Sequence, residues 1–116
     1  MMVLVAGPYR SGTGDDPALI EANMRAMNEA ALALFRAGHI GITGEAVALP
    51  LVALAGSHAV GDAGWNELMH PIGRMLAERC DGVLRIGGPS AGADEMVAIA
   101  TANGKPVFYS VAEVVA

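Results

Sequence analysis

The chain has 116 residues and a formal net charge of -5; 53% of its residues are hydrophobic and 16% are charged. This length suits one domain over residues 1–116 and leaves no room for a second module. The negative charge argues against nucleic acid as a partner. The longest apolar run, residues 46–55, is shorter than the roughly 20 residues that cross a bilayer, so no membrane partner is expected.

The high apolar content predicts that another subunit covers part of the surface, so we expect a homo-oligomer, either a dimer or a tetramer. Met1 leads directly into an apolar run without a basic leader, and the single cysteine, Cys80, cannot form an internal disulfide. These features favour a cytoplasmic protein. No cofactor and no metal site is predicted.

Residues 2–6 form an apolar run that predicts a buried strand, and this run breaks at Gly7 into a glycine-rich loop. The loop after the carboxyl end of a parallel strand is where open α/β sheets bind ligands. Bare glycine backbone, a fixed positive charge and a hydroxyl suit phosphate or sugar oxygens. The candidate binding residues are Gly7, Tyr9, Arg10, Ser11 and Gly12.

A structural alternative for this loop is a turn that only redirects the chain, with Arg10 as a solvated charge. The loop has no lysine followed by serine or threonine, as a P-loop would, and its glycine spacing differs from the dinucleotide-binding fingerprint. ATP and NAD are therefore not supported as ligands.

An acidic cap before Pro17 predicts the start of a long helix, and Gly38 predicts its end. Its expected core-facing residues are Ile20, Met24, Met27, Ala31, Leu34 and Phe35. Residues 39–44 suit a parallel strand that returns beside the first. Glu45 then follows on the same side of the sheet as the glycine loop, either as a ligand for a sugar hydroxyl or as an ordinary acid at a helix start.

Residues 46–55 predict an apolar helix that is kinked or begins near Pro50, and this helix is the best candidate for a subunit contact. The glycine-rich residues 56–64 favour a mobile loop or lid. Helical periodicity returns at residues 65–76, where Pro71 predicts two short helices or a kink. His70 is a candidate for proton transfer, although a lone histidine is more often structural.

Residues 80–86 predict the next buried strand, with Cys80 as a small buried hydrophobe. A second glycine-rich loop follows at residues 87–93, and a helix is expected from Asp94 to Gly104. Residues 105–109 predict the last strand, and Ser110 is suited to cap a short final helix. The alternation predicts a three-layer α/β fold, a flavodoxin- or Rossmann-like parallel sheet of about four to five strands with helices on both faces.

Five short pieces of sequence, taken in order, resemble the nucleoside 2-deoxyribosyltransferase superfamily, including its small bacterial branch and the related nucleotide N-glycosidases. They are residues 5–9 (VAGPY), 36–39 (RAGH), 79–84 (RCDGVL), 90–93 (SAGA) and 104–107 (GKPV). The resemblance implies a flavodoxin-like sheet that binds a nucleoside or nucleoside monophosphate. It also implies chemistry at the N-glycosidic bond, where a carboxylate meets the charge on the anomeric carbon.

The resemblance extends to both loops. The first loop, from Tyr9 to Gly12, matches the family's first binding loop. In the second loop the residues that would grip a 5′ oxygen or phosphate are Ser90, Gly92 and Ala93. In the family, a nucleophilic glutamate follows the second-loop glycine by four residues, and an aspartate in the helix before the third strand assists it.

This sequence departs from that pattern at both carboxylates. Met96 stands where the glutamate is expected, with Glu95 one residue earlier, and Gly73 stands where the aspartate is expected. The catalytic candidates are therefore Glu95, Asp94 and His70, although the two acids also suit the positive end of a helix. Two functions follow from the resemblance: an enzyme that cleaves or transfers an N-glycosidic bond, or a nucleotide-binding sensor that has lost the chemistry. A purely structural oligomer-forming domain is a third alternative.

Overall fold

The computed structural model describes residues 1–114. Its strands and helices alternate in the predicted order. They are β1 (Met2–Ala6), α1 (Pro17–Arg36), β2 (Ile40–Thr43), α2 (Gly44–Leu54), α3 (Ala63–Arg79), β3 (Gly82–Arg85), α4 (Ala91–Ala102), β4 (Val107–Phe108) and the 3-10 helix η1 (Val111–Glu113). None of the helices within residues 1–114 is long and apolar enough to cross a membrane.

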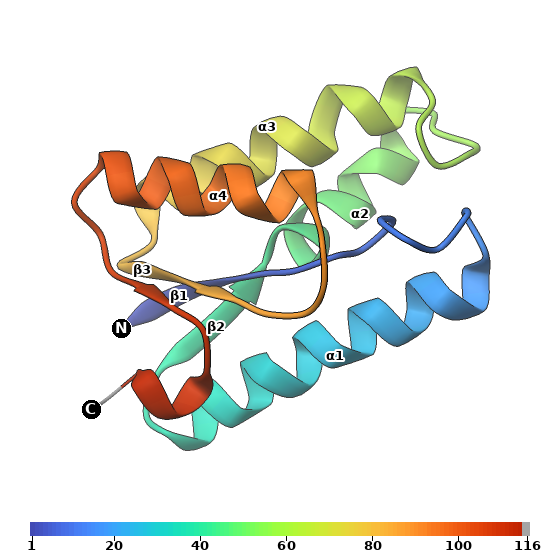
Figure 1. The fold of residues 1–116 in the computed structure, drawn as a ribbon. Helices are drawn as coiled ribbons and strands as arrows, with labels where there is room; N and C mark the ends of the chain where they lie inside the picture. The colour runs from blue at the N-terminus through green and yellow to red at the C-terminus, as the bar shows by residue number, and fades with distance from the viewer. Residues whose placement is uncertain (115–116) are drawn as a thin grey trace.

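The strands form a parallel sheet in the order β2-β1-β3-β4 (Figure 1). The central strand is β1, whose Val5 pairs with Thr43 of β2 and with Leu84 of β3. Because these strands are parallel, the carboxyl ends of β1, β2 and β3 lie at one edge of the sheet. The predicted α/β fold class is confirmed.

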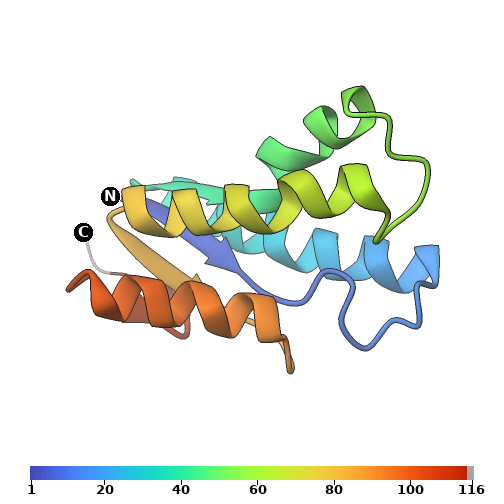
Figure 2. The same cartoon turned by 90° about the horizontal axis from the view of Figure 1, so that it is seen from above.

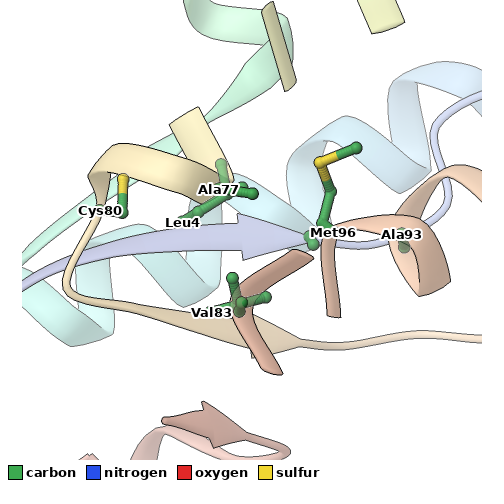
Figure 3. Close-up of a cluster of buried hydrophobic side chains, with 8 residues drawn as sticks. Leu4, Ala77, Cys80, Val83, Ala93 and Met96 are labelled. Carbon is green, nitrogen blue, oxygen red and sulfur yellow. The ribbon is translucent and has the colours of Figure 1, made fainter. Parts of the chain in front are cut away.

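Alternate residues of the strands face two helical layers, because successive side chains of a strand point to opposite faces. Val3 and Val5 pack with Leu34 of α1 on one face. Leu4 packs with Ala77 of α3 and with α4 on the other face, as the close-up in Figure 3 shows. Seen from above, α2 runs along α3, against which it packs (Figure 2).

The boundaries of α1 agree with the sequence. The Asp16 carboxylate accepts a hydrogen bond from the backbone N–H of Ala18 at 3.0 Å. At the other end, Gly38 has a φ of +92°, a left-handed conformation that glycine adopts without strain. The prediction that Phe35 faces the core is wrong, since it is 70% exposed. Adjacent helical residues point about 100° apart, so Phe35 cannot share the inward direction of the buried Leu34.

Both helices with an internal proline are continuous in secondary structure. The helix α2 begins at Gly44, where Thr43 caps it by accepting the Ala46 N–H, and it passes through Pro50. The helix α3 likewise runs through Pro71 without dividing into two. Both prolines are exposed, so their rings and the unpaired carbonyls one turn earlier can be accommodated at the surface.

The helix α4 begins at Ala91 rather than at Asp94, so the second glycine loop is shorter than predicted. The reason is a cap, because Ser90 Oγ accepts the Ala93 backbone N–H at 3.1 Å. The final helix is a single 3-10 turn after Ser110.

Candidate functional site

A cavity of about 390 Å³ lies at the carboxyl edge of the sheet. It is lined by the loop after β1, the first turn of α2, one side of α3 and the first turns of α4. The predicted site residues that line it are Gly7, Tyr9, Arg10, Ser11, Glu45, His70, Ser90, Gly92 and Ala93. Within the described chain, Gly12, Asp94 and Glu95 are not among its lining residues.

The two glycine loops touch one another next to Gly7, which lines this cavity. A Cβ on Gly7 would lie 3.0 Å from the Ile86 carbonyl oxygen. Gly87 has a φ of +77°, and a Cβ there would lie 2.7 Å from Pro8 Cδ. Glycine is therefore required at position 87, and a side chain at position 7 would push the loops after β1 and β3 apart.

The Asp15 carboxylate binds one edge of the Arg10 guanidinium through two hydrogen bonds. Its Nε donates to Asp15 Oδ1 at 2.7 Å and its Nη2 donates to Asp15 Oδ2 at 3.2 Å. This hydrogen bonding raises the pKa of Arg10 and lowers the pKa of Asp15. The guanidinium also rests against Gly61, where a Cβ would lie 2.7 Å from Nη1. A phosphate that binds Arg10 would therefore compete with the Asp15 carboxylate for the guanidinium.

Asp62 organises the loop that was expected to be mobile. Its carboxylate accepts hydrogen bonds from the Ser57 hydroxyl at 2.8 Å and from the backbone N–H groups of His58 at 2.7 Å, Ala59 at 3.1 Å and Trp65 at 3.0 Å. These bonds lower the pKa of Asp62 far below its ordinary value. The loop between α2 and α3 is therefore tied to the first turn of α3.

Trp65 is a site residue that the sequence analysis missed. Its ring stacks on Tyr9, with ring centroids 5.8 Å apart and planes inclined by 27°, and both residues line the cavity. Its helical spacing suggested an ordinary core position. The one available signal was the aspartate three residues earlier, because a capping aspartate starts the helix there and turns Trp65 toward the β1 loop.

Glu45 lies in the first turn of α2, and its partly buried side chain lines the cavity. Burial raises the pKa of the Glu45 carboxyl above its ordinary value. The pKa of the nearby Tyr9 hydroxyl is also raised, first by burial and then by the negative charge of Glu45. A negative charge on Glu45 therefore disfavours ionisation of the Tyr9 hydroxyl within the cavity.

Glu95 faces α3 from the first turns of α4. Its Oε2 lies 2.5 Å from His70 Nε2, and its Oε1 lies 3.3 Å from Arg74 Nε. His70 itself lines the cavity, so Glu95 reaches the cavity only through the imidazole.

Asp94 points to another part of the second loop. It accepts a hydrogen bond from Arg85 Nε at 3.1 Å. Arg85 also donates to the carbonyl oxygens of Ile86 at 2.6 Å and Gly88 at 2.8 Å. Arg85 and Asp94 therefore hold the backbone of the loop that precedes Ser90.

Within residues 1–114 there is no group of three or more His, Cys, Asp or Glu side chains that could hold a metal ion. The cavity contains glycine backbone, hydroxyls, an aromatic pair, an imidazole and a carboxyl group, which are groups suited to an organic ligand with a polar or charged end.

A comparison with solved structures finds a matching fold. The chain superposes on a 2-deoxyribosyltransferase from the psychrotolerant bacterium Bacillus psychrosaccharolyticus with a TM-score of 0.65 and 17% sequence identity, over 92% of this chain and 69% of that one. The chain has a nucleoside 2-deoxyribosyltransferase-like fold. No protein-family model matches the sequence, and no curated protein matches it.

In this deoxyribosyltransferase-like fold, the two positions at which the sequence resemblance expects carboxylates face one another without any charge. Met96 and Gly73 both line the cavity, and a Cβ on Gly73 would lie 3.4 Å from Met96 Sδ. Figure 3 shows Met96 extending from α4, near Ala93. The methionine side chain packs over the bare glycine, so this part of the wall is apolar.

Proposed function

We propose that the protein binds a nucleoside or nucleoside monophosphate in this cavity and cleaves or transfers its N-glycosidic bond. One observation carries the proposal: glycine backbone from two strand ends, an aromatic pair and acid-base groups share one cavity in a deoxyribosyltransferase-like fold. The sugar, base and phosphate of a nucleotide each need one of these kinds of group.

The sugar-phosphate end fits the two loops. Ser90, Gly92 and Ala93 lie at the start of α4, where the positive end of the helix dipole favours an anion. Ser11 and Arg10 would add a hydroxyl and a cation from the opposite loop.

The base fits the aromatic side of the cavity. Tyr9 and Trp65 offer ring surface to a planar ligand, and stacking of a base on an aromatic side chain is worth about 1–3 kcal/mol. Glu45, in the neighbouring turn of α2, suits a hydroxyl or a ring nitrogen of the bound ligand.

The imidazole of His70 is a candidate for proton transfer in the reaction. Its contact with Glu95 engages Nε2 and leaves Nδ1 as the ring nitrogen for a ligand or a water molecule. Glu95 then acts through His70, as a positioning residue. Asp94 is the weaker catalytic candidate, because its bond to Arg85 supports the loop.

A second candidate function is a binding module without chemistry, and a specific observation favours it. Met96 and Gly73 leave the wall apolar where the resemblance expects the nucleophile and its assisting acid. Such a module would bind the same ligands and leave the glycosidic bond intact.

A single experiment separates these functions. Purified protein is screened by thermal shift against the four 2′-deoxynucleosides, the four ribonucleosides and their 5′-monophosphates, and each mixture is then assayed for free base by chromatography. Stabilisation with base release supports the enzyme, and stabilisation without release supports the binding module. If no compound raises the Tm or yields free base, both functions are excluded and a structural domain is favoured.

We also propose self-association through α2. Its residues Leu51 and Leu54 are exposed, Leu54 at 86%, and so is Met75 of the neighbouring α3. Leucines exposed to this extent on adjacent helical turns are typical of a surface that another subunit covers.

A further inference from the structure

Glu45 differs from the other acids near the cavity in its contacts. Within residues 1–114, no side chain of another residue forms a hydrogen bond or an ion pair with its carboxyl group. Glu95, in contrast, lies between His70 and Arg74. The Asp94 carboxylate is bound by Arg85. Glu45 is therefore the carboxyl group that lines the cavity without a partner side chain in the described part of the chain.

The surroundings of Glu45 favour its protonated form. The other titratable groups that line the cavity are Tyr9, Arg10 and His70. Arg10 is already bound to Asp15, which offsets part of its positive charge. Burial raises the pKa of the Glu45 carboxyl, which then keeps its proton at a higher pH than an exposed glutamate does.

We propose that Glu45 is the general acid for cleavage of the N-glycosidic bond in this cavity. The inference rests on the proposed function. It names the carboxyl group that would take part in the chemistry, since Met96 and Gly73 stand at the two positions where carboxylates are expected. A purine or pyrimidine leaves poorly as an anion, so a proton must reach it as the bond breaks. Glu45, in the first turn of α2, is the carboxyl group of the cavity lining that can supply this proton, whereas the two acids of α4 lie outside the lining.

Cleavage of the glycosidic bond needs water as its only other reactant. The bond between C1′ and the base nitrogen breaks, its electron pair goes to that nitrogen, and the nitrogen takes the proton of Glu45. The carboxylate that forms faces the positive charge on C1′ and stabilises it. Water then adds to C1′ and returns a proton to Glu45, so the products are the free base and the sugar.

Met96 and Gly73 stand at the two positions where the resemblance expects carboxylates, so neither position supplies an acid. Among residues 1–114, Glu45 is the carboxyl group that lines the cavity and is placed to act as the acid. One carboxyl group would serve first as acid and then as base, as in the proton shuttling of glycosidases.

The test compares Glu45→Gln with Glu67→Gln. Glu67 is an exposed glutamate on α3 that does not line the cavity, so its variant is the matched control. Base release is measured with the nucleosides and monophosphates that the wild-type protein cleaves, and binding of the same compounds is measured by thermal shift. We expect Glu45→Gln to bind these compounds and to lose at least about 100-fold in base release.

A leaving group that needs no proton distinguishes a general acid from a structural residue. 4-Nitrophenyl β-D-ribofuranoside and its 2-deoxy counterpart release a stable phenolate. We expect the loss in Glu45→Gln to fall below tenfold with these compounds, while Glu67→Gln matches the wild type with every compound. An equal loss with nucleosides and nitrophenyl glycosides would overturn the assignment.

The remaining outcomes are also decisive. If the wild type releases base and Glu45→Gln does so within threefold, Glu45 is not the acid, and the proposed function stands. If the wild type binds nucleosides without releasing base or nitrophenolate, the chemistry and this inference both fail, and only binding remains. Should Glu45→Gln not fold, the wild-type pH profile decides: the rate must fall as the pH rises through the raised pKa of Glu45, and a flat profile refutes the proposal.

Discussion

The Glu95 carboxylate lies 2.5 Å from Nε2 of His70, and this contact joins α4 to α3 at the wall of the cavity. It fixes the imidazole that lines the cavity while keeping the carboxylate itself out of the lining. In the proposed function, the acid at position 95 orients the histidine and does not itself contact the ligand.

Replacement of Glu95 tests that relationship. In Glu95→Gln we expect base release to fall about 10- to 100-fold, because a misaligned catalytic group costs up to about that factor. Binding should change less than threefold. The measurement is base release together with ligand-induced thermal shift, and Glu78→Gln, at an exposed glutamate of α3 that does not line the cavity, serves as the control. Unchanged turnover in Glu95→Gln would show that the pair is structural.

Glu45 makes stability depend on pH in a defined direction. Its pKa is raised in the folded state, so between its unfolded and folded pKa values the folded state binds more protons. Stability therefore falls as the pH rises through that window. Glu45→Gln should have a higher Tm than the wild type at pH 8, with a smaller difference at pH 4. Thermal unfolding at several pH values measures it, and a Tm difference independent of pH would contradict the role of burial.

Asp62 should have the opposite dependence. Its pKa is lowered by the hydrogen bonds that it accepts, so its contribution is present above the unfolded pKa and is lost as the pH falls toward the folded value. Asp62→Ala should have a lower Tm than the wild type at pH 7, and the two values should converge at low pH. Because Trp65 is the only tryptophan, near-ultraviolet circular dichroism of this variant should also report a loosened indole ring.

Trp65 should report on ligand binding. A base that stacks near the Tyr9–Trp65 pair changes the environment of the indole, so nucleotide titration should alter its fluorescence. Trp65→Leu keeps an apolar side chain and removes the ring, and we expect affinity to fall about 5- to 100-fold, the range of one lost stacking contact. Phe35→Leu, at an exposed site on α1, is the control. Equal affinity of Trp65→Leu and wild type would place the base elsewhere.

The exposed leucines of α2 test self-association. Leu54→Arg introduces a charge on the surface that we propose to be covered, so a dimer or tetramer should dissociate. Light scattering at micromolar concentration measures the mass. Leu32→Arg, at an exposed position of α1, should leave the mass unchanged. A wild-type protein that is already monomeric at this concentration would refute the assembly.

The amino-acid sequence by itself determined the order of the elements and the edge of the sheet at which the site lies. These features depend on local patterns: the apolar run of residues 2–6, the cap before Pro17, the glycine at position 38 and the glycines after two strands. Each is decided by neighbours within a turn or a strand, so periodicity and capping rules predicted them.

Only the tertiary structure decided which side chains share the cavity. The contacts of Glu95 with His70 and of Trp65 with Tyr9 each join residues of different elements or loops. The direction of each side chain depends on where its helix begins, and a shift of one residue turns it by about 100°. The packing of the helices on the sheet places Glu45 in the cavity lining and leaves Asp94 and Glu95 of α4 outside it.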